Sequence, residues 1–137
     1  MTTTLVDKDR QNPMEIAFTD RELDVMAVLW DLGSGTVAEV QERLVDDLAY
    51  TTVLTILRTL EEKGRVRHEE EGRAYRYYAL VGREEAGANA VRRLLRKVFR
   101  GSPEMLLTHL VAERGLTSDQ IGRMKALLDK RMREGEK

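Results

Sequence analysis

The stretch that decides the fold reads YTTVLTILRTLEEKG, from Tyr50 to Gly64. Its apolar residues recur at helical spacing and form one inward stripe: Val53, Ile56, Leu57 and Leu60. The opposite face carries Thr52, Thr55, Thr59 and Glu62, and Thr51 and Arg58 flank it. Threonine is an intrinsically poor helix former, so its concentration on one face indicates a role for that face beyond helix formation. We expect a helix from Thr51 to about Lys63, ended by Gly64.

Two short helices are expected before this stretch. Thr19–Glu22 and Thr36–Glu39 both have the capping-box form, in which a threonine and a glutamate three residues later cap a helix start. We expect the apolar stripe of the first helix at Leu23, Met26, Ala27 and Trp30. Apolar residues at Val37, Val40 and Leu44 indicate a short second helix. Residues 1–18 are expected to form a flexible N-terminal arm.

A β-hairpin is expected directly after the 51–63 helix. Val66–His68 and Tyr75–Leu80 have strand character, and residues 69–73, with Gly72, are expected to connect them. Three short helices followed by a hairpin is the order of a winged helix-turn-helix domain, in which the hairpin is the wing. We place this domain at residues 19–82.

The remaining residues, 83–137, predict three amphipathic helices, from Glu84 to Phe99, from Pro103 and from Thr117. Helices this short cannot bury all their apolar faces against one another, and exposed apolar stripes usually mark an interface. The sequence therefore predicts a helical dimerisation domain on a mainly α chain with one small β-hairpin. The residues expected between two chains of a homodimer are Leu94, Leu95, Phe99, Leu106, Leu110, Ile121 and Leu128.

Charge is unevenly distributed along the chain. Residues 83–137 carry 13 Lys/Arg against 8 Asp/Glu, a net of +5, while residues 1–82 carry 10 against 16, a net of −6. A nucleic-acid-binding surface on this chain would have to use a few local lysine and arginine side chains. Its non-specific affinity for nucleic acid should therefore be weak. The chain has no cysteine, no secretory signal and no apolar run long enough to cross a bilayer, so we expect a cytoplasmic protein without membrane insertion.

The threonine and arginine side chains of the 51–63 helix are candidate contacts to double-stranded DNA. A helix in the major groove reads base edges mainly through its N-terminal residues, and both threonine and arginine suit that role. Arg73, at the tip of the expected wing, is the other candidate contact. A merely solvated helix face, and pairing of Arg73 with Glu69–Glu71, are the alternatives.

Nothing in the sequence indicates an enzyme, a cofactor or a metal site. The two histidines, His68 and His109, are far apart and have no carboxylate at zinc-ligand spacing. No phosphate-binding loop or catalytic pair is present. Tyr75, Tyr77 and Tyr78 are expected to pack within a strand rather than to stack on bases.

The segments DRELDVMAVLW from Asp20, TVAEV from Thr36, YTTVLTILRTLEEKG from Tyr50 and YRYY from Tyr75 together resemble the penicillinase-repressor (BlaI/MecI) family. The similarity covers roughly Thr19 to Lys130. It implies a dimeric repressor that binds an operator of dyad symmetry, often controls β-lactamase or related resistance genes, and is released when a membrane sensor protease signals and the repressor is cleaved.

One position departs from the family. Its best-known members are cut at an Asn-Phe bond in the second helix of the dimerisation domain, which corresponds here to His109–Leu110. The resemblance therefore implies possible cleavage at this bond, with histidine in place of asparagine. A ligand-sensing winged-helix regulator and a winged-helix module for protein–protein contact are the alternative functions.

Overall fold

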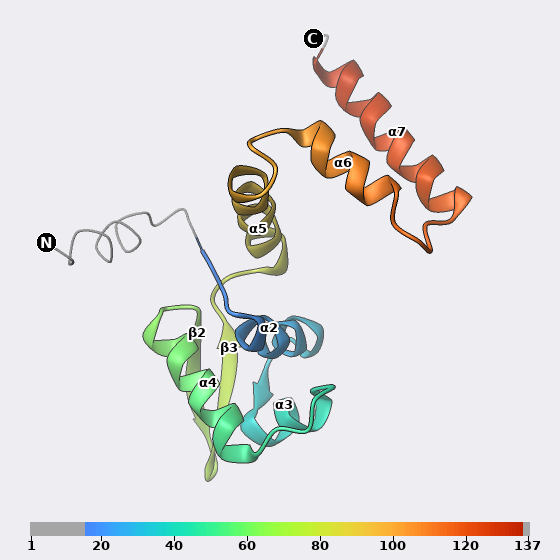
Figure 1. Cartoon of the computed structure of the whole chain (residues 1–137). Helices are drawn as coiled ribbons and strands as arrows, with labels where there is room; N and C mark the ends of the chain where they lie inside the picture. Colours follow the sequence, from blue (N-terminus) through green and yellow to red (C-terminus); the bar gives the residue numbers. More distant parts are fainter. Residues whose placement is uncertain (1–15, 136–137) are drawn as a thin grey trace, which may run out of the picture. The chain divides into compact units, whose positions relative to one another are not determined.

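The computed structural model describes residues 16–135 (Figure 1). The chain divides between Arg93 and Leu94 into two compact units, here called the N-terminal unit and the C-terminal unit. The domain boundary expected between residues 82 and 83 lies earlier in the chain than this division. In chain order the elements are α2 (Asp20–Leu32), β1 (Gly35–Thr36), α3 (Val37–Arg43), α4 (Tyr50–Glu62), β2 (Val66–Glu71), β3 (Ala74–Ala79), α5 (Arg83–Lys97), α6 (Pro103–Val111) and α7 (Ser118–Gly135).

Helix α2 begins at the predicted cap. Thr19 Oγ1 accepts from the amide of Glu22, and the Glu22 carboxylate accepts from the amide of Thr19, so the capping box is confirmed. The buried face differs from the expected stripe, because Leu23 is exposed while Val25 and Leu29 are completely buried. Almost every position from Leu23 to Trp30 is apolar, so periodicity alone could not identify the face that α3, α4 and β3 would cover.

Thr36 is the N-cap of α3, and its predicted capping box with Glu39 is confirmed. Immediately before it, β1 pairs antiparallel with β3, with Gly35 opposite Tyr77 and Thr36 opposite Arg76. The sequence does not predict this strand, because two residues are too few to show a period. A side chain at Gly35 would come within 3.1 Å of Val40 Cγ2, which explains the glycine.

The hairpin is longer than expected. Strands β2 and β3 pair from Val66 opposite Ala79 to Glu71 opposite Ala74, so only Gly72 and Arg73 form the turn. The prediction that residues 69–71 belong to the connection is therefore wrong. Three consecutive glutamates carry no hydrophobic alternation, whereas Gly72, at φ 62°, makes a two-residue turn feasible. The sheet has the order β1-β3-β2.

Helix α4 supplies much of the core of the N-terminal unit. Its predicted inward stripe is confirmed, because Val53, Leu57 and Leu60 are completely buried and Ile56 packs against them. Phe18 also reaches this core and meets the Trp30 ring edge-on, with ring centroids 6.5 Å apart. Residues 1–15 of the expected arm lie outside the described residues. The winged helix-turn-helix order of three helices and a hairpin is thus confirmed.

The C-terminal unit begins within α5 and continues through α6 and α7. The cap of α6 is as predicted, with Ser102 Oγ accepting from the Met105 amide at 3.2 Å and Pro103 in the first turn. Thr117 and Gln120 cap the start of α7 reciprocally. No residue of α6 or α7 is buried, and hydrophobic side chains of these helices stay at the surface. None of the helices described is both long and apolar enough to cross a membrane.

Candidate nucleic-acid interface

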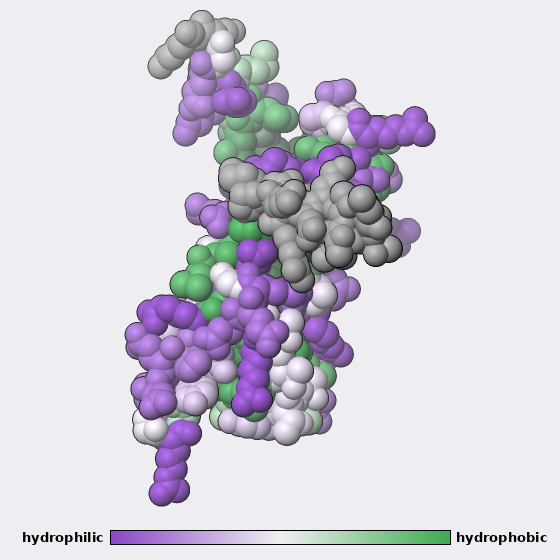
Figure 2. All heavy atoms as spheres, turned by 90° about the vertical axis from the view of Figure 1, so that its left-hand side faces the viewer, coloured by the Kyte–Doolittle hydropathy of each residue, from purple (hydrophilic) through white to green (hydrophobic). Residues whose placement is uncertain are grey.

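One face of α4 is polar and open to solvent. Because Val53 and Leu57 point into the core, the opposite positions Thr51, Thr52, Thr55 and Arg58 are exposed, while Thr59 is half-buried. Figure 2, seen from the left of Figure 1, shows polar side chains over most of the surface where α4 and the hairpin lie. The face is thus available for contact with another molecule.

The start of α4 adds unpaired backbone donors to this face. Ala49 occupies the N-cap, and its methyl side chain cannot accept a hydrogen bond from the first amides of the helix. These amides, together with the positive end of the helix dipole, favour a nearby anion. Thr55 donates its hydroxyl to the carbonyl of Thr51 at 2.9 Å, so its oxygen faces outward mainly as an acceptor.

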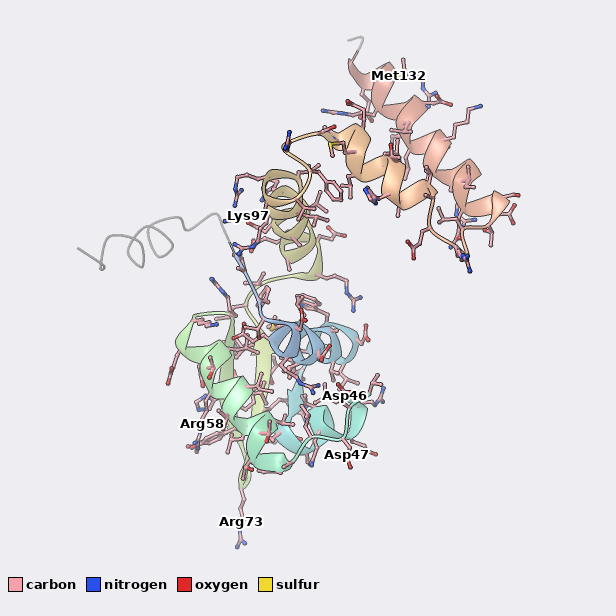
Figure 3. All side chains as sticks on the ribbon, viewed as in Figure 1. Asp46, Asp47, Arg58, Arg73, Lys97 and Met132 are labelled. Carbon is pink, nitrogen blue, oxygen red and sulfur yellow. The ribbon has the colours of Figure 1, made fainter. Side chains whose placement is uncertain are left out.

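Arg58 and Arg73 are the two arginines that the sequence predicts as DNA contacts. Within the part of the chain that the structure describes, neither forms an ion pair with an acid. Figure 3 shows Arg58 on the outer side of α4 and Arg73 extending away from the tip of the hairpin. Both cations are therefore free to approach phosphates or base edges.

The acids of the wing are largely neutralised by arginines of the wing itself. Arg67 contacts Glu69 at 2.8 Å and lies 4.4 Å from the centroid of the Tyr78 ring. Arg76 contacts Glu71 at 2.9 Å. The alternative, in which Arg73 pairs with Glu69–Glu71, is not seen among residues 16–135, where Glu69 pairs with Arg67 and Glu71 with Arg76.

Arg76 also joins the wing to α3. Its guanidinium donates to both carboxylate oxygens of Glu39, at 3.0 and 3.1 Å, to both oxygens of Glu71, at 3.0 and 2.9 Å, and to Ser34 Oγ at 3.2 Å. The hydrogen bonds from Arg76 hold the pKa values of Glu39 and Glu71 below their ordinary range, and those carboxylates raise the pKa of Arg76. The sequence does not predict this role of Arg76, because its partners lie on α3, on β2 and in the segment before β1.

A second contact joins the wing to α4. His68 Nδ1 lies 2.6 Å from Glu61 Oε2, and the His68 ring is tilted against Tyr75, with centroids 4.3 Å apart. Tyr77 is buried beneath them, and this burial, with the nearby Glu61 carboxylate, raises its pKa. The tyrosines therefore pack within the wing, as expected.

The candidate dimer residues differ in exposure. Leu94, Leu110, Ile121 and Leu128 are exposed, Leu95 and Leu106 are half-buried, and Phe99 is buried. Phe99 packs within its own chain against His109, with ring centroids 5.3 Å apart. The His109–Leu110 bond lies in α6, and both residues are exposed. Among residues 16–135, no three His, Asp or Glu side chains gather as a metal site would require.

Known proteins resemble this chain over most of its length. The model of the penicillinase repressor family matches residues 18–130. The transcriptional regulator BlaI of Mycobacterium tuberculosis is 39% identical over 100 residues, which cover 70% of this chain and 72% of that protein. The methicillin resistance regulatory protein MecI of Staphylococcus aureus is 23% identical over 114 residues, covering 80% of this chain and 91% of that protein.

Solved structures are also similar. The solution structure of the DNA-binding domain of the repressor BlaI is 31% identical and covers 50% of this chain and 85% of that domain, with a TM-score of 0.46. A MarR family protein from Bacillus stearothermophilus is 19% identical and covers 99% of this chain and 88% of that protein, with a TM-score of 0.47.

Proposed function

Since the chain belongs to the penicillinase repressor family of transcriptional regulators, we propose that it is a dimeric repressor that binds a dyad-symmetric DNA operator. The observation that carries the proposal is the exposed face of α4. This face holds hydroxyl side chains and Arg58, which forms no ion pair among residues 16–135, on a helix whose N-cap residue makes no side-chain hydrogen bond. Such a face fits the major groove, where threonine and arginine can reach base edges and phosphates.

In this proposal α4 is the recognition helix, and its contacts are Thr51, Thr52, Thr55, Arg58 and Thr59. Arg73 extends the contact from the turn of the wing to the neighbouring backbone or minor groove. Two copies related by a two-fold axis would read half-sites about 34–36 Å apart, or a multiple of that distance.

The second copy is expected on the C-terminal unit. Exposed apolar side chains there, including Leu94, Leu110, Ile121 and Leu128, would be covered by the same residues of the partner chain. Pairing provides the second half-site. Without it, an N-terminal unit of acidic overall charge would hold DNA only weakly.

The name of one relative suggests the kind of gene that is controlled. MecI is named as a methicillin resistance regulatory protein. We propose that this chain likewise controls genes of the antibiotic-resistance type. Cleavage by a sensor protease at His109–Leu110 is proposed as the means of release.

The experiment that tests the function starts from a random pool of duplex DNA. The full chain selects its preferred duplex, and a mobility-shift assay then compares wild type, Arg58→Ala and Thr55→Ala on that duplex. Arg58→Ala should lose about 1–3 kcal/mol of binding free energy and relax preference at one position of each half-site. Arg123→Ala removes a charge from α7 and serves as the control. If both α4 variants bind the duplex as tightly as wild type, α4 does not make the sequence-specific contacts with DNA.

A further inference from the structure

We propose that Arg76 is a positioning residue that fixes the wing against the helix-turn-helix, so that Arg73 and α4 meet the DNA together. This inference rests on the proposed function. It concerns a residue that does not itself need to touch DNA, because its guanidinium is occupied by Glu39, Glu71 and Ser34.

Arg76 stands where the sheet changes from three strands to two. Strand β1 pairs only with Tyr77 and Arg76 of β3, so Arg76 is the last residue of β3 with a neighbour on both sides. Beyond it, towards the turn, Tyr75 and Ala74 are held by β2 alone. An isolated two-stranded hairpin is marginally stable in water. The outer part of the wing therefore needs support from side chains.

The guanidinium supplies this support in both directions. Towards the body of the domain it binds Glu39, a residue of the first turn of α3 that also caps that helix. Towards the tip it binds Glu71, the last residue of β2 before the turn that carries Arg73. The planar fork of arginine can hold two carboxylates at once in fixed directions, which the ammonium of lysine cannot do.

Charge makes the position of the wing depend on Arg76. Glu39 and Glu71 lie close enough for the Glu39 charge to oppose ionisation of Glu71. With the guanidinium in place, the two carboxylates share one cation. Without it, two like charges face each other between α3 and the wing, and the wing is driven away from α3.

The first test is a double-mutant cycle on the duplex that the full wild-type chain selects from a random pool. We expect Arg73→Ala to weaken binding on the order of tenfold in the wild-type background, equal to about 1.4 kcal/mol. In the Arg76→Met background, Arg73→Ala should weaken binding less than about threefold, because a displaced wing no longer holds Arg73 at the DNA. Equal factors in both backgrounds would mean that the residues act independently, and would overturn the proposal.

A matched pair of variants removes the same charge from neighbouring residues of β2. Glu70 pairs with Tyr75 in the sheet and forms no ion pair among the residues described here, whereas Glu71 binds Arg76. Loss of a negative charge near DNA favours binding in both cases. We expect Glu70→Gln to bind at least as tightly as wild type and Glu71→Gln to bind more weakly. Equal tightening in the two variants would contradict a positioning role.

Amide hydrogen exchange on the full chain without DNA separates this proposal from the proposed function. In Arg76→Met the amides of residues 70–75 should exchange at least about tenfold faster, while those of residues 53–60 stay protected. If the Arg76→Met variant fails to fold, the Arg76→Lys variant is measured in its place. Unchanged protection of the wing would overturn the proposal. If the wild-type chain selects no duplex, the proposed function fails, and the exchange data still decide whether Arg76 holds the wing.

Discussion

Lys63 Nζ lies 2.8 Å from Glu22 Oε2 and so ties the C-terminal end of α4 to the first turn of α2. The Glu22 side chain is 5% exposed and the Lys63 side chain 43%. Glu22 also accepts from the amide of Thr19 at the start of α2. One carboxylate therefore caps α2 and holds the C-terminal end of α4 against it.

The asymmetry in burial predicts unequal effects of removing the two partners. Lys63→Ala leaves a buried carboxylate without its cation and should destabilise the N-terminal unit by about 1–3 kcal/mol. Lys125→Ala, on α7, removes an exposed lysine and should change stability by less than about 0.5 kcal/mol. Urea unfolding followed by Trp30 fluorescence measures both. Equal midpoints for the two variants would show that the Glu22 contact contributes little.

A second prediction concerns acid. Burial alone would raise the pKa of Glu22, but hydrogen bonds from Lys63 and Thr19 outweigh it, and the pKa is lowered. The pKa values of Glu39 and Glu71 are lowered by Arg76. The unfolded chain then binds more protons than the folded chain in the acid range, so these contacts stabilise fully above the ordinary glutamate pKa of about 4.3 and are lost as pH falls through the lowered values.

Unfolding by urea between pH 3 and pH 7 measures this dependence. Stability should fall with decreasing pH, and the slope should be shallower in a Glu22→Gln variant, because glutamine does not titrate. Glu84→Gln, near the start of α5, is the control for removal of one exposed carboxylate. A wild-type stability that is flat across the acid range would contradict the assignment of these three carboxylates.

Local signals in the sequence were sufficient for much of the fold. A capping box involves residues three apart, so Thr19 and Thr36 mark helix starts without knowledge of the rest of the chain. The inward stripe of α4 is equally local, since it needs only the helical period. Once the buried stripe of α4 is known, the opposite face of the helix, which includes Arg58, is predicted to be exposed.

Contacts between distant segments could not be predicted in the same way. Arg76 meets residues 37 and 42 positions away, and Lys63 meets one 41 positions away. The buried face of α2 was misassigned for the same reason, because the choice among several apolar stripes depends on how the other elements pack. The first predicted strand of the wing is too short because charged residues of an exposed strand give no hydrophobic alternation.

The third prediction concerns the dimer. Sedimentation at micromolar concentration should give about twice the chain mass of 15.7 kDa. Leu110→Glu should shift this towards the monomer, because a charge would be buried in the apolar face between the chains. Val45→Glu places the same charge on a fully exposed residue of the N-terminal unit and should leave the dimer intact. A wild-type chain that sediments as a monomer with full helicity would refute the proposed interface.

The last prediction concerns release by cleavage at His109–Leu110. Helix α6 has no buried residue, so local unwinding to admit a protease should cost little. A cut there separates α7 and the end of α6 from the chain and so removes part of the proposed dimer surface. Without the dimer, the contact with the second half-site is lost. We expect a chain ending at His109 to be monomeric and to bind the selected duplex at least about 100-fold more weakly than wild type, the factor that corresponds to about 2.7 kcal/mol of binding free energy. In cells treated with a β-lactam, mass spectrometry should detect the fragment ending at His109 while the target genes are expressed. Full expression with only intact protein would show that release works through a ligand or a partner instead.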